Sequence, residues 1–428
     1  MSEAFCTEIG PWLRTAARPT IDREALALLF APPVLYGEFY PWQGASLAEP
    51  PARCSTGPGA GLGPAFGRAV ARAAADAAVI GVSFSGGMDS LAVLAEACRQ
   101  ARGRRVVAFT IALVDDHGRA AADVAAALIT QLGLRCEVQV VDTTETAAVA
   151  WSPIGPRLDA LPQLNAALAA RAAATGCEVL LSGDGADEVL EVPRFATCEL
   201  LTARGPRAAL RYLGDRGRGS VLVDEAAAVL ARAVPQRAGA RMYWGATWAT
   251  TLGAPVPAVV ADRFRARVQD WSTRWLAGHL DRCREHRSWA ARFAHDAIWP
   301  HAPLLDAGAI PERSPFLDAE VLTAAAALTP AHRYDPDLPT PYQRNKAAVV
   351  SLIEPDHRPM LPPAKQYFQT ALGALIEPCQ PRLLTAAGVI DPAGLDTADT
   401  AVAMTVTATE TWLRDALARG ARLPGVTS

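Results

Sequence analysis

An apolar run that ends in a glycine turn limits the folds open to this chain more than any other feature. Residues 78–84 (Ala-Val-Ile-Gly-Val-Ser-Phe) have the composition of a buried parallel strand, and Ser85-Gly86-Gly87-Met88-Asp89-Ser90 follows them directly. The next residues, 91–95, are good helix formers. A strand, a glycine turn and a helix start bring backbone N–H groups and the positive end of a helix together. The pattern therefore predicts an α/β fold with an anion site at this turn.

The residues of this turn suit the phosphates of a nucleotide. Gly86 and Gly87 allow a tight bend and a close approach of the backbone, because neither carries a Cβ. Ser85 and Ser90 add hydroxyl donors, and Asp89 offers a hard oxygen ligand for Mg²⁺. The spacing differs from Gly-x-Gly-x-x-Gly and from the P-loop that ends in Gly-Lys-Ser/Thr. We therefore expect a pyrophosphate-binding loop of another class.

A second apolar run, residues 177–181, ends in a similar turn, Ser182-Gly183-Asp184-Gly185-Ala186-Asp187-Glu188. Ligands of open α/β sheets bind at the carboxyl ends of strands, so the two turns can face each other across one crevice. Alone, the second turn could be an ordinary connection in which Asp184 caps a helix. Together the two turns resemble the ATP pyrophosphatase domain of asparagine synthetases. Relatives of these enzymes include the β-lactam synthetases and the cyclases that close lasso-peptide macrolactams.

Three downstream segments extend the resemblance. Residues 313–318 (Arg-Ser-Pro-Phe-Leu-Asp) are similar to the family's Arg-x-Pro-Phe-Leu-Asp element. Residues 342–346 and 361–368 look like its two lysine segments. Of the 41 lysines and arginines in the chain, only Lys346 and Lys365 are lysines. A chain so biased toward arginine is expected to keep lysine where a compact ammonium is needed, although chance retention is the alternative.

By this resemblance the chain is an ATP-dependent amide synthetase. A substrate carboxylate attacks the α-phosphorus of ATP, pyrophosphate leaves, and an amine captures the acyl-adenylate to give an amide and AMP. Asp89 and Asp187, both expected on turns, are implied to bind Mg²⁺ against the phosphates. Residues 85–90 are implied to hold pyrophosphate. Lys365 is implied to be the catalytic lysine, which stabilises charge on the phosphate and on the tetrahedral intermediate.

The same resemblance implies roles for further residues. Asp184 stands at a variable position of the second motif, where a carboxylate can accept the proton of the attacking amine. Arg313 is implied to help close the site, with a structural ion pair as an equal alternative. The other implied residues are the second lysine, Lys346, and the adenosine contacts Phe84, Ile111, Ser182 and Gly183.

Two departures from the family pattern bear on the product. Residues 189–195 replace a glycine-rich, aromatic stretch, and Lys365 is followed by Gln366 rather than by glycine. Both departures argue against asparagine as the product and leave ATP handling intact. The favoured reaction is closure of a lactam or macrolactam by an amine of the same substrate. The alternatives are amidation with ammonia from a separate glutaminase, and a non-catalytic scaffold for a precursor peptide; the scaffold would need decayed catalytic positions.

The chain divides into three expected parts. The stretch ahead of the first glycine turn is too short for the glutaminase domain of full-length asparagine synthetases, so residues 1–66 are expected to be a truncated remnant. Residues 67–200 are predicted to form the ATP-pyrophosphatase core, a doubly wound parallel sheet of the adenine nucleotide α-hydrolase type. Residues 201–428 are predicted to be mostly helical and to complete the active site. Within the core, further strands are predicted at 105–113 and 137–141, and helices at 120–132 and 161–175.

Composition narrows the setting. A net charge of −3 and a pI near 6.2 predict no nucleic-acid partner. The eight cysteines form no Cys-x-x-Cys pair, which is typical of free thiols in a reducing compartment. No signal peptide and no membrane span are indicated, so a cytoplasmic protein is expected. The expected partners are a small-molecule or peptide substrate that carries a carboxylate and an amine, with a precursor peptide or a pathway protein as a further candidate.

Overall fold

The computed structural model describes most of the core and parts of both ends of the chain. The described residues are 19–31, 41–43, 61–153, 155–158, 161–192, 196–216, 225, 256–284, 309–375 and 379–426. Much of the expected remnant, residues 1–66, lies outside these ranges. Its interpretation as a truncated segment stays a prediction.

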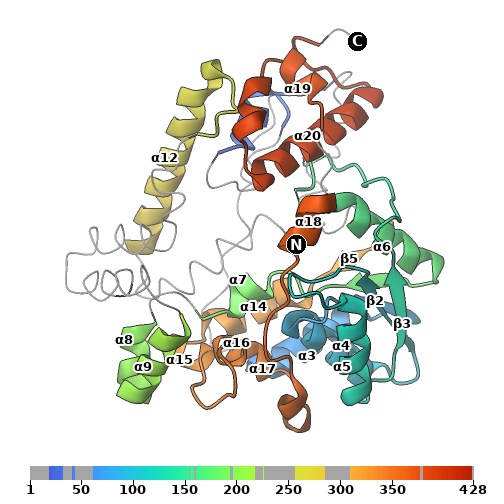
Figure 1. Ribbon diagram of the computed structural model, residues 1–428, viewed down its shortest axis with the longest axis vertical. Coiled ribbons are helices and arrows are strands. Elements are labelled where there is room, and N and C mark those ends of the chain that lie inside the picture. Colours follow the sequence, from blue (N-terminus) through green and yellow to red (C-terminus); the bar gives the residue numbers. More distant parts are fainter. Residues whose placement is uncertain are drawn as a thin grey trace.

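A parallel sheet of five strands forms the centre of the molecule (Figure 1). Its strands are β1 (Val79–Ser83), β2 (Arg105–Ile111), β3 (Glu137–Val141), β4 (Val179–Leu181) and β5 (Glu312–Arg313). Their order is β3-β2-β1-β4-β5, so the chain first builds outward from β1 and then returns to its other side. The direction of winding reverses between β1 and β4. In a doubly wound sheet, the carboxyl ends of the strands at such a reversal are where ligands bind.

Both faces of the sheet are buried. Ile80 and Val82 point into one hydrophobic cluster, whereas Val107 and Phe109 point into another on the opposite face. The first face is covered by α3 (Leu62–Ala73), α4 (Met88–Gln100), α5 (Ala121–Gln131), α14 (Ala319–Ala326) and α17 (Ala347–Val350), and the second by α6 (Pro162–Ala174). This arrangement confirms the predicted doubly wound core.

The helix after the first glycine turn begins earlier than predicted, and a short helix follows the second turn. Met88-Asp89-Ser90 forms the first turn of α4, and α7 (Ala186–Leu190) begins one residue before Asp187. The expectation that both carboxylates lie on turns is therefore wrong, because each lies in the first turn of a helix. The N-cap residues are glycines in both cases, Gly87 and Gly185, and the φ of +80° at Gly185 lets the chain turn abruptly into the helix.

The later part of the chain is mostly helical, as predicted, and also contributes the short strand β5. Besides α14 and α17, its described α-helices are α8 (Thr197–Arg204), α9 (Pro206–Asp215), α12 (Asp262–Arg284), α15 (Pro330–Arg333), α16 (Pro341–Asn345), α18 (Gln369–Leu375), α19 (Arg382–Ala386) and α20 (Thr400–Ala418). Three short 3₁₀ helices are η2 (Pro315–Leu317), η3 (Pro355–Met360) and η4 (Pro392–Thr397).

The two ends of the chain share a separate hydrophobic cluster away from the sheet (Figure 1). Helix α2 (Arg23–Leu28) contributes Leu26, and α20 contributes Leu413 and Trp412. The backbone N–H of Ile21 donates to the carbonyl of Arg422 at 2.7 Å. The segment 19–43 therefore packs, where described, against the C-terminal helices.

Candidate active site

The two glycine turns meet at the reversal point of the sheet. A Cβ placed on Gly183 would lie 2.8 Å from the backbone nitrogen of Ser90, so the second turn touches the first backbone to backbone. Within the first turn, the hydroxyls of Ser85 and Ser90 lie 3.2 Å apart. The prediction that the two turns face each other is confirmed. Only a residue without a side chain fits at position 183.

A cavity of about 330 Å³ opens between these turns, within the size range of small-ligand sites. Residues of both motifs, of both lysine segments and of the end of β1 line it: Ser83, Ser85, Gly87, Asp89, Ser90, Ser182, Gly183, Asp184, Gly185, Asp187, Tyr342, Lys365, Gln366 and Phe368. The structure thus brings together nine of the predicted site residues around one space. Gly86 and Lys346 adjoin it without lining it.

Two carboxylates and two lysines form the charged centre of this site. The Lys346 Nζ donates to both carboxylate oxygens of Asp89 at 2.7 Å and also pairs with Asp187. The Lys365 Nζ donates to Asp187 Oδ2 at 3.0 Å. Lys346 is 3% exposed, whereas the side chain of Lys365 is 45% exposed. One lysine therefore lies beneath the carboxylates and the other stands at the rim of the cavity.

The pKa values of the two carboxylates in this group are shifted in opposite directions. Burial raises the pKa of Asp89, against the attraction of Lys346, and the negative charge of Asp187 raises it further. Burial also acts on Asp187, but both lysines outweigh it and hold the pKa of Asp187 below its usual range. The two carboxylates in turn raise the pKa of Lys346 in spite of its burial. Asp187 is therefore the more firmly ionised carboxylate of the pair.

The donor set fits Mg²⁺ better than a metal that needs an all-protein cage. Among the described residues, no group of three or more His, Cys, Asp and Glu side chains gathers at one point. Mg²⁺ is commonly held by one or two carboxylates together with substrate phosphates and water. Asp89 and Asp187, which converge on the same ammonium group, could hold such an ion jointly with the phosphates of a nucleotide.

The start of α4 is open for an anion. Gly87, its N-cap residue, supplies no side-chain hydrogen bond to the free backbone N–H groups. A φ of +78° at Gly86 turns the chain into this start, and the Gln366 side chain lies over it. The backbone N–H of Met88 is 3.4 Å from the Tyr342 hydroxyl, its partner in this structure. An uncapped helix start with a glycine turn before it is suited to phosphate oxygens.

Besides Gly86 and Lys346, three further implied residues do not line this cavity. Phe84 is 1% exposed and packs in the core beneath α4, and Ile111 packs against the cluster on the opposite face of the sheet. Arg313 lies in β5, where its carbonyl accepts a hydrogen bond from the backbone N–H of Ser182 at 3.0 Å. Its backbone thereby holds the second glycine turn. The adenosine contacts expected of Phe84 and Ile111 stay predictions.

Sequence reasoning missed the residues that position the second lysine segment. Asp116, beyond the carboxyl end of β2, accepts from the backbone N–H groups of Gln369 at 3.2 Å and Thr370 at 2.9 Å. Its own N–H donates to the carbonyl of Tyr367 at 2.8 Å. The neighbouring Asp115 accepts from the Gln366 side chain at 3.1 Å. The signal in the sequence was a pair of adjacent aspartates directly after a buried strand. Ligands of such sheets bind at the carboxyl ends of the strands, so polar residues at these ends are candidates for binding or positioning.

We expect Asp116→Ala to lower kcat about tenfold while the KM for ATP changes little. The loss of charge-assisted hydrogen bonds, worth about 1.5–3 kcal/mol each, frees the segment that carries Lys365 but leaves the glycine turns in place. Steady-state kinetics at varied ATP concentration measure the effects on kcat and on KM separately. Asp391→Ala is the matched control, because Asp391 caps η4 at a distance from the site. Equal effects of the two substitutions would contradict a positioning role for Asp116.

One comparison, with a model of a protein family, agrees with this geometry. The family model for asparagine synthase matches residues 61–362. A solved structure that matches is the U34-tRNA thiolase NcsA from Methanococcus maripaludis with its 4Fe-4S cluster. It is 16% identical, the match covers 53% of this chain and 79% of that chain, and the TM-score is 0.23, too low to carry an argument. No curated protein matches the chain significantly.

None of the described helices combines the length and the apolar character needed to cross a membrane. The family match spans both glycine turns with Asp89 and Asp187, and the first lysine segment with Lys346; it covers more than half of the chain. Members of the matched family are carbon–nitrogen ligases that convert ATP to AMP and pyrophosphate and form an amide through an adenylated carboxylate. This chain belongs to the asparagine synthase family.

Proposed function

We propose that this ligase joins a carboxylate and an amine carried by the same substrate, closing a lactam or a macrolactam as lasso-peptide cyclases do. The observation that carries the proposal is the open rim of the cavity. Asp184 is exposed there, the Lys365 side chain is 45% exposed, and Tyr367 is 55% exposed. A large substrate can therefore present its reacting groups from solvent.

Residues of the site divide the work of the first step. The start of α4 and the serines of the first turn hold the leaving pyrophosphate. Mg²⁺ bound by Asp89 and Asp187 supplies charge neutralisation for the phosphates. Burial lowers the pKa of Lys365, but Asp187 more than offsets this and raises it, so the ammonium stays charged. A cation at this position stabilises charge that develops on the α-phosphate.

The second step needs a base and a nearby amine. The Asp184 carboxylate lines the cavity and accepts a hydrogen bond from the Ser182 hydroxyl at 2.9 Å, which fixes its direction. A carboxylate so placed takes the proton of the attacking amine. An amine tethered to the activated carboxylate has a high effective concentration, whereas dissolved ammonia would have to enter a site open to water.

Two other functions are weaker. Amidation with ammonia from a separate glutaminase uses the same adenylation centre and differs only in the amine. A non-catalytic scaffold for a precursor peptide would not need the charged centre, yet Asp89, Asp187 and both lysines are assembled around one cavity. The retained centre supports catalysis.

The source of the amine decides the proposal. We expect a substrate with its own carboxylate and amine to react with Mg²⁺ and ATP, to release AMP and pyrophosphate, and to lose one water (about 18 Da). ¹⁵N-labelled ammonium in the mixture should neither enter the product nor speed the reaction, because the tethered amine is already concentrated. Mass spectrometry of the product gives the answer. Incorporation of the label would end the intramolecular proposal, and release of ADP would contradict the adenylation chemistry.

A further inference from the structure

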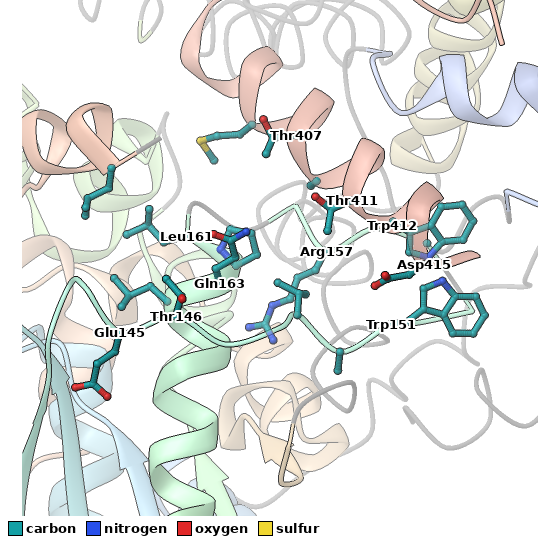
Figure 2. A pocket seen from close by; sticks show the side chains of 18 of the residues that line it. Glu145, Thr146, Trp151, Arg157, Leu161, Gln163, Thr407, Thr411, Trp412 and Asp415 are labelled. Atoms are coloured by element: carbon teal, nitrogen blue, oxygen red, sulfur yellow. The ribbon is translucent and has the colours of Figure 1, made fainter. Parts of the chain in front are cut away.

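A second cavity, of about 240 Å³, lies between α20 and the segment that joins β3 to α6 (Figure 2). It shares no lining residue with the cavity of the charged centre. From α20, the lining residues recur at helical spacing along one face of the helix: Met404, Thr407, Ala408, Thr411, Trp412 and Asp415. The opposite wall includes Val149, Trp151, Leu161 and Leu164. The walls are thus mainly apolar.

Two tryptophans form one end of this cavity. The rings of Trp151 and Trp412 lie parallel within 13°, with centroids 6.3 Å apart. The Trp412 Nε1 donates to the carbonyl of Ser152 at 2.7 Å. The Trp151 Nε1 is buried and has no acceptor among the described residues. Buried donors are almost always paired in proteins, so this N–H is suited to donate to a carbonyl or carboxylate oxygen of a ligand.

The charges that line the cavity leave one carboxylate unused. Arg157 pairs with Glu312 at 3.4 Å, and Glu145 pairs with Arg171 at 2.6 Å. Asp415 forms no ion pair with any residue in the described part of the chain. In Figure 2 it lies at the same end as the two tryptophans, with Glu145 at the other end. This end therefore offers one free N–H donor and one free acceptor beside apolar walls.

That combination matches a peptide unit. A peptide bond presents one carbonyl acceptor and one N–H donor, and the side chain next to it can fill an apolar space. A hydrocarbon ligand would leave both polar groups of the wall unpaired. A simple anion would meet the Asp415 carboxylate.

Two structural links join this cavity to the charged centre. Phe368 lines the first cavity, and Leu375, the last of the seven residues of α18, lines the second. At 1.5 Å per residue this helix is about 10 Å long. The second link is β5, because Glu312 pairs with Arg157 while the Arg313 carbonyl holds Ser182. A substrate that occupies both cavities must extend over about 10 Å, roughly three extended residues.

We propose that the second cavity binds an apolar side chain of a peptide substrate, about three residues or more from the reacting group. The backbone carbonyl of that residue accepts from the Trp151 Nε1, and its N–H faces the Asp415 carboxylate. The inference rests on the proposed function, because it assumes that the substrate with its own carboxylate and amine is a peptide. It adds a specificity site separate from the adenylation centre.

The test uses blocked tripeptides, which cannot react because they have neither a free carboxylate nor a free amine. The probes are N-acetyl-Gly-Phe-Gly-amide and N-acetyl-Gly-Ala-Gly-amide, titrated against the full chain with saturation-transfer NMR. We expect the phenylalanine peptide to bind about tenfold more tightly or better than the alanine peptide, since its larger side chain fills the apolar space.

A matched pair of variants on α20 locates the binding. Ala408→Leu narrows the cavity, whereas Ala418→Leu makes the same change on the exposed end of the same helix. Ala408→Leu should weaken binding of the phenylalanine peptide about tenfold or more, and Ala418→Leu should not change it. Trp151→Phe keeps an aromatic ring but removes the N–H together with part of the ring system. Trp151→Phe should also weaken binding of the phenylalanine peptide. It provides an independent test if Ala408→Leu does not fold.

The outcomes are distinct from those for the proposed function. Absence of binding to the wild-type chain, no preference for phenylalanine, or unchanged binding by both Ala408→Leu and Trp151→Phe would overturn the inference. None of these results bears on the product that forms with ¹⁵N-ammonium present. Conversely, ¹⁵N in that product would contradict intramolecular closure, whereas the measured binding of the blocked peptides would stay the same.

Discussion

Asp187→Asn should reduce formation of AMP and pyrophosphate a hundredfold or more, and Asp89→Asn should do the same. Each substitution removes a negative charge where Mg²⁺ and the phosphates of ATP meet, and metal ions contribute several kcal/mol of charge stabilisation to such reactions. At about 1.4 kcal/mol for each factor of ten, that loss corresponds to at least a hundredfold in rate. Pyrophosphate release in the presence of a reactive substrate measures the effect.

The fold should survive both substitutions. Asparagine has nearly the shape of aspartate and still accepts a hydrogen bond from the Lys346 ammonium, which in each variant keeps the other carboxylate as its partner. Thermal unfolding followed by circular dichroism is the control for folding. Near-normal pyrophosphate release by either well-folded variant would show that its carboxylate does not hold the metal.

Substitution of the buried Lys346, unlike substitution of either aspartate, should lower the stability of the fold. Lys346→Met leaves the carboxylates of Asp89 and Asp187 facing each other without the ammonium between them. Removal of one partner from a buried ion pair typically destabilises a protein by about 3–5 kcal/mol. Asp187 keeps Lys365 as a partner, which moderates the loss. The two lysines of the chain therefore differ in kind, since one supports the carboxylates and the other faces the cavity.

The core was predictable from the sequence because its signals are local. Strands β1 and β2 and the run at 177–181 are mostly apolar, and each glycine turn follows its strand directly, so composition and spacing within ten or so residues identify them. The strand β5 escaped prediction, because two residues carry no periodic pattern and pair with β4 only through the tertiary fold. The start of α4 at Met88 was not predicted either, because helix propensity defines the ends of helices poorly.

The charged centre was predictable in its members but not in its geometry. The rarity of lysine indicated both Lys346 and Lys365, yet nothing local shows that the first lies between Asp89 and Asp187. Asp89 and Lys346 are 257 residues apart in the chain. Contacts over such separations depend on how the helical part folds back on the sheet. The role of Asp116 was missed for the same reason.

Lys365→Arg should be nearly as inactive as Lys365→Ala. The Lys365 side chain is 45% exposed, and Asp187 is its one hydrogen-bond partner among the described residues, so neither substitution should disturb the fold. Its proposed contact with the α-phosphate forms mainly in the transition state, and losing such a contact lowers the rate by about 3–4 kcal/mol, a hundred- to a thousandfold. A planar guanidinium is wider than an ammonium and cannot occupy the same point between Asp187 and a phosphate.

The arginine-rich composition makes this substitution a strict test. Arginine serves as the cation almost everywhere else in the chain, so a site that needed only positive charge would accept it. Arg68→Lys is the control, because it makes the reverse exchange in an exposed ion pair with Glu320, and we expect unchanged activity. Single-turnover formation of AMP at saturating ATP compares the variants. If Lys365→Arg keeps most of the activity, a general positive charge suffices at this position, and the rarity of lysine carries no functional meaning.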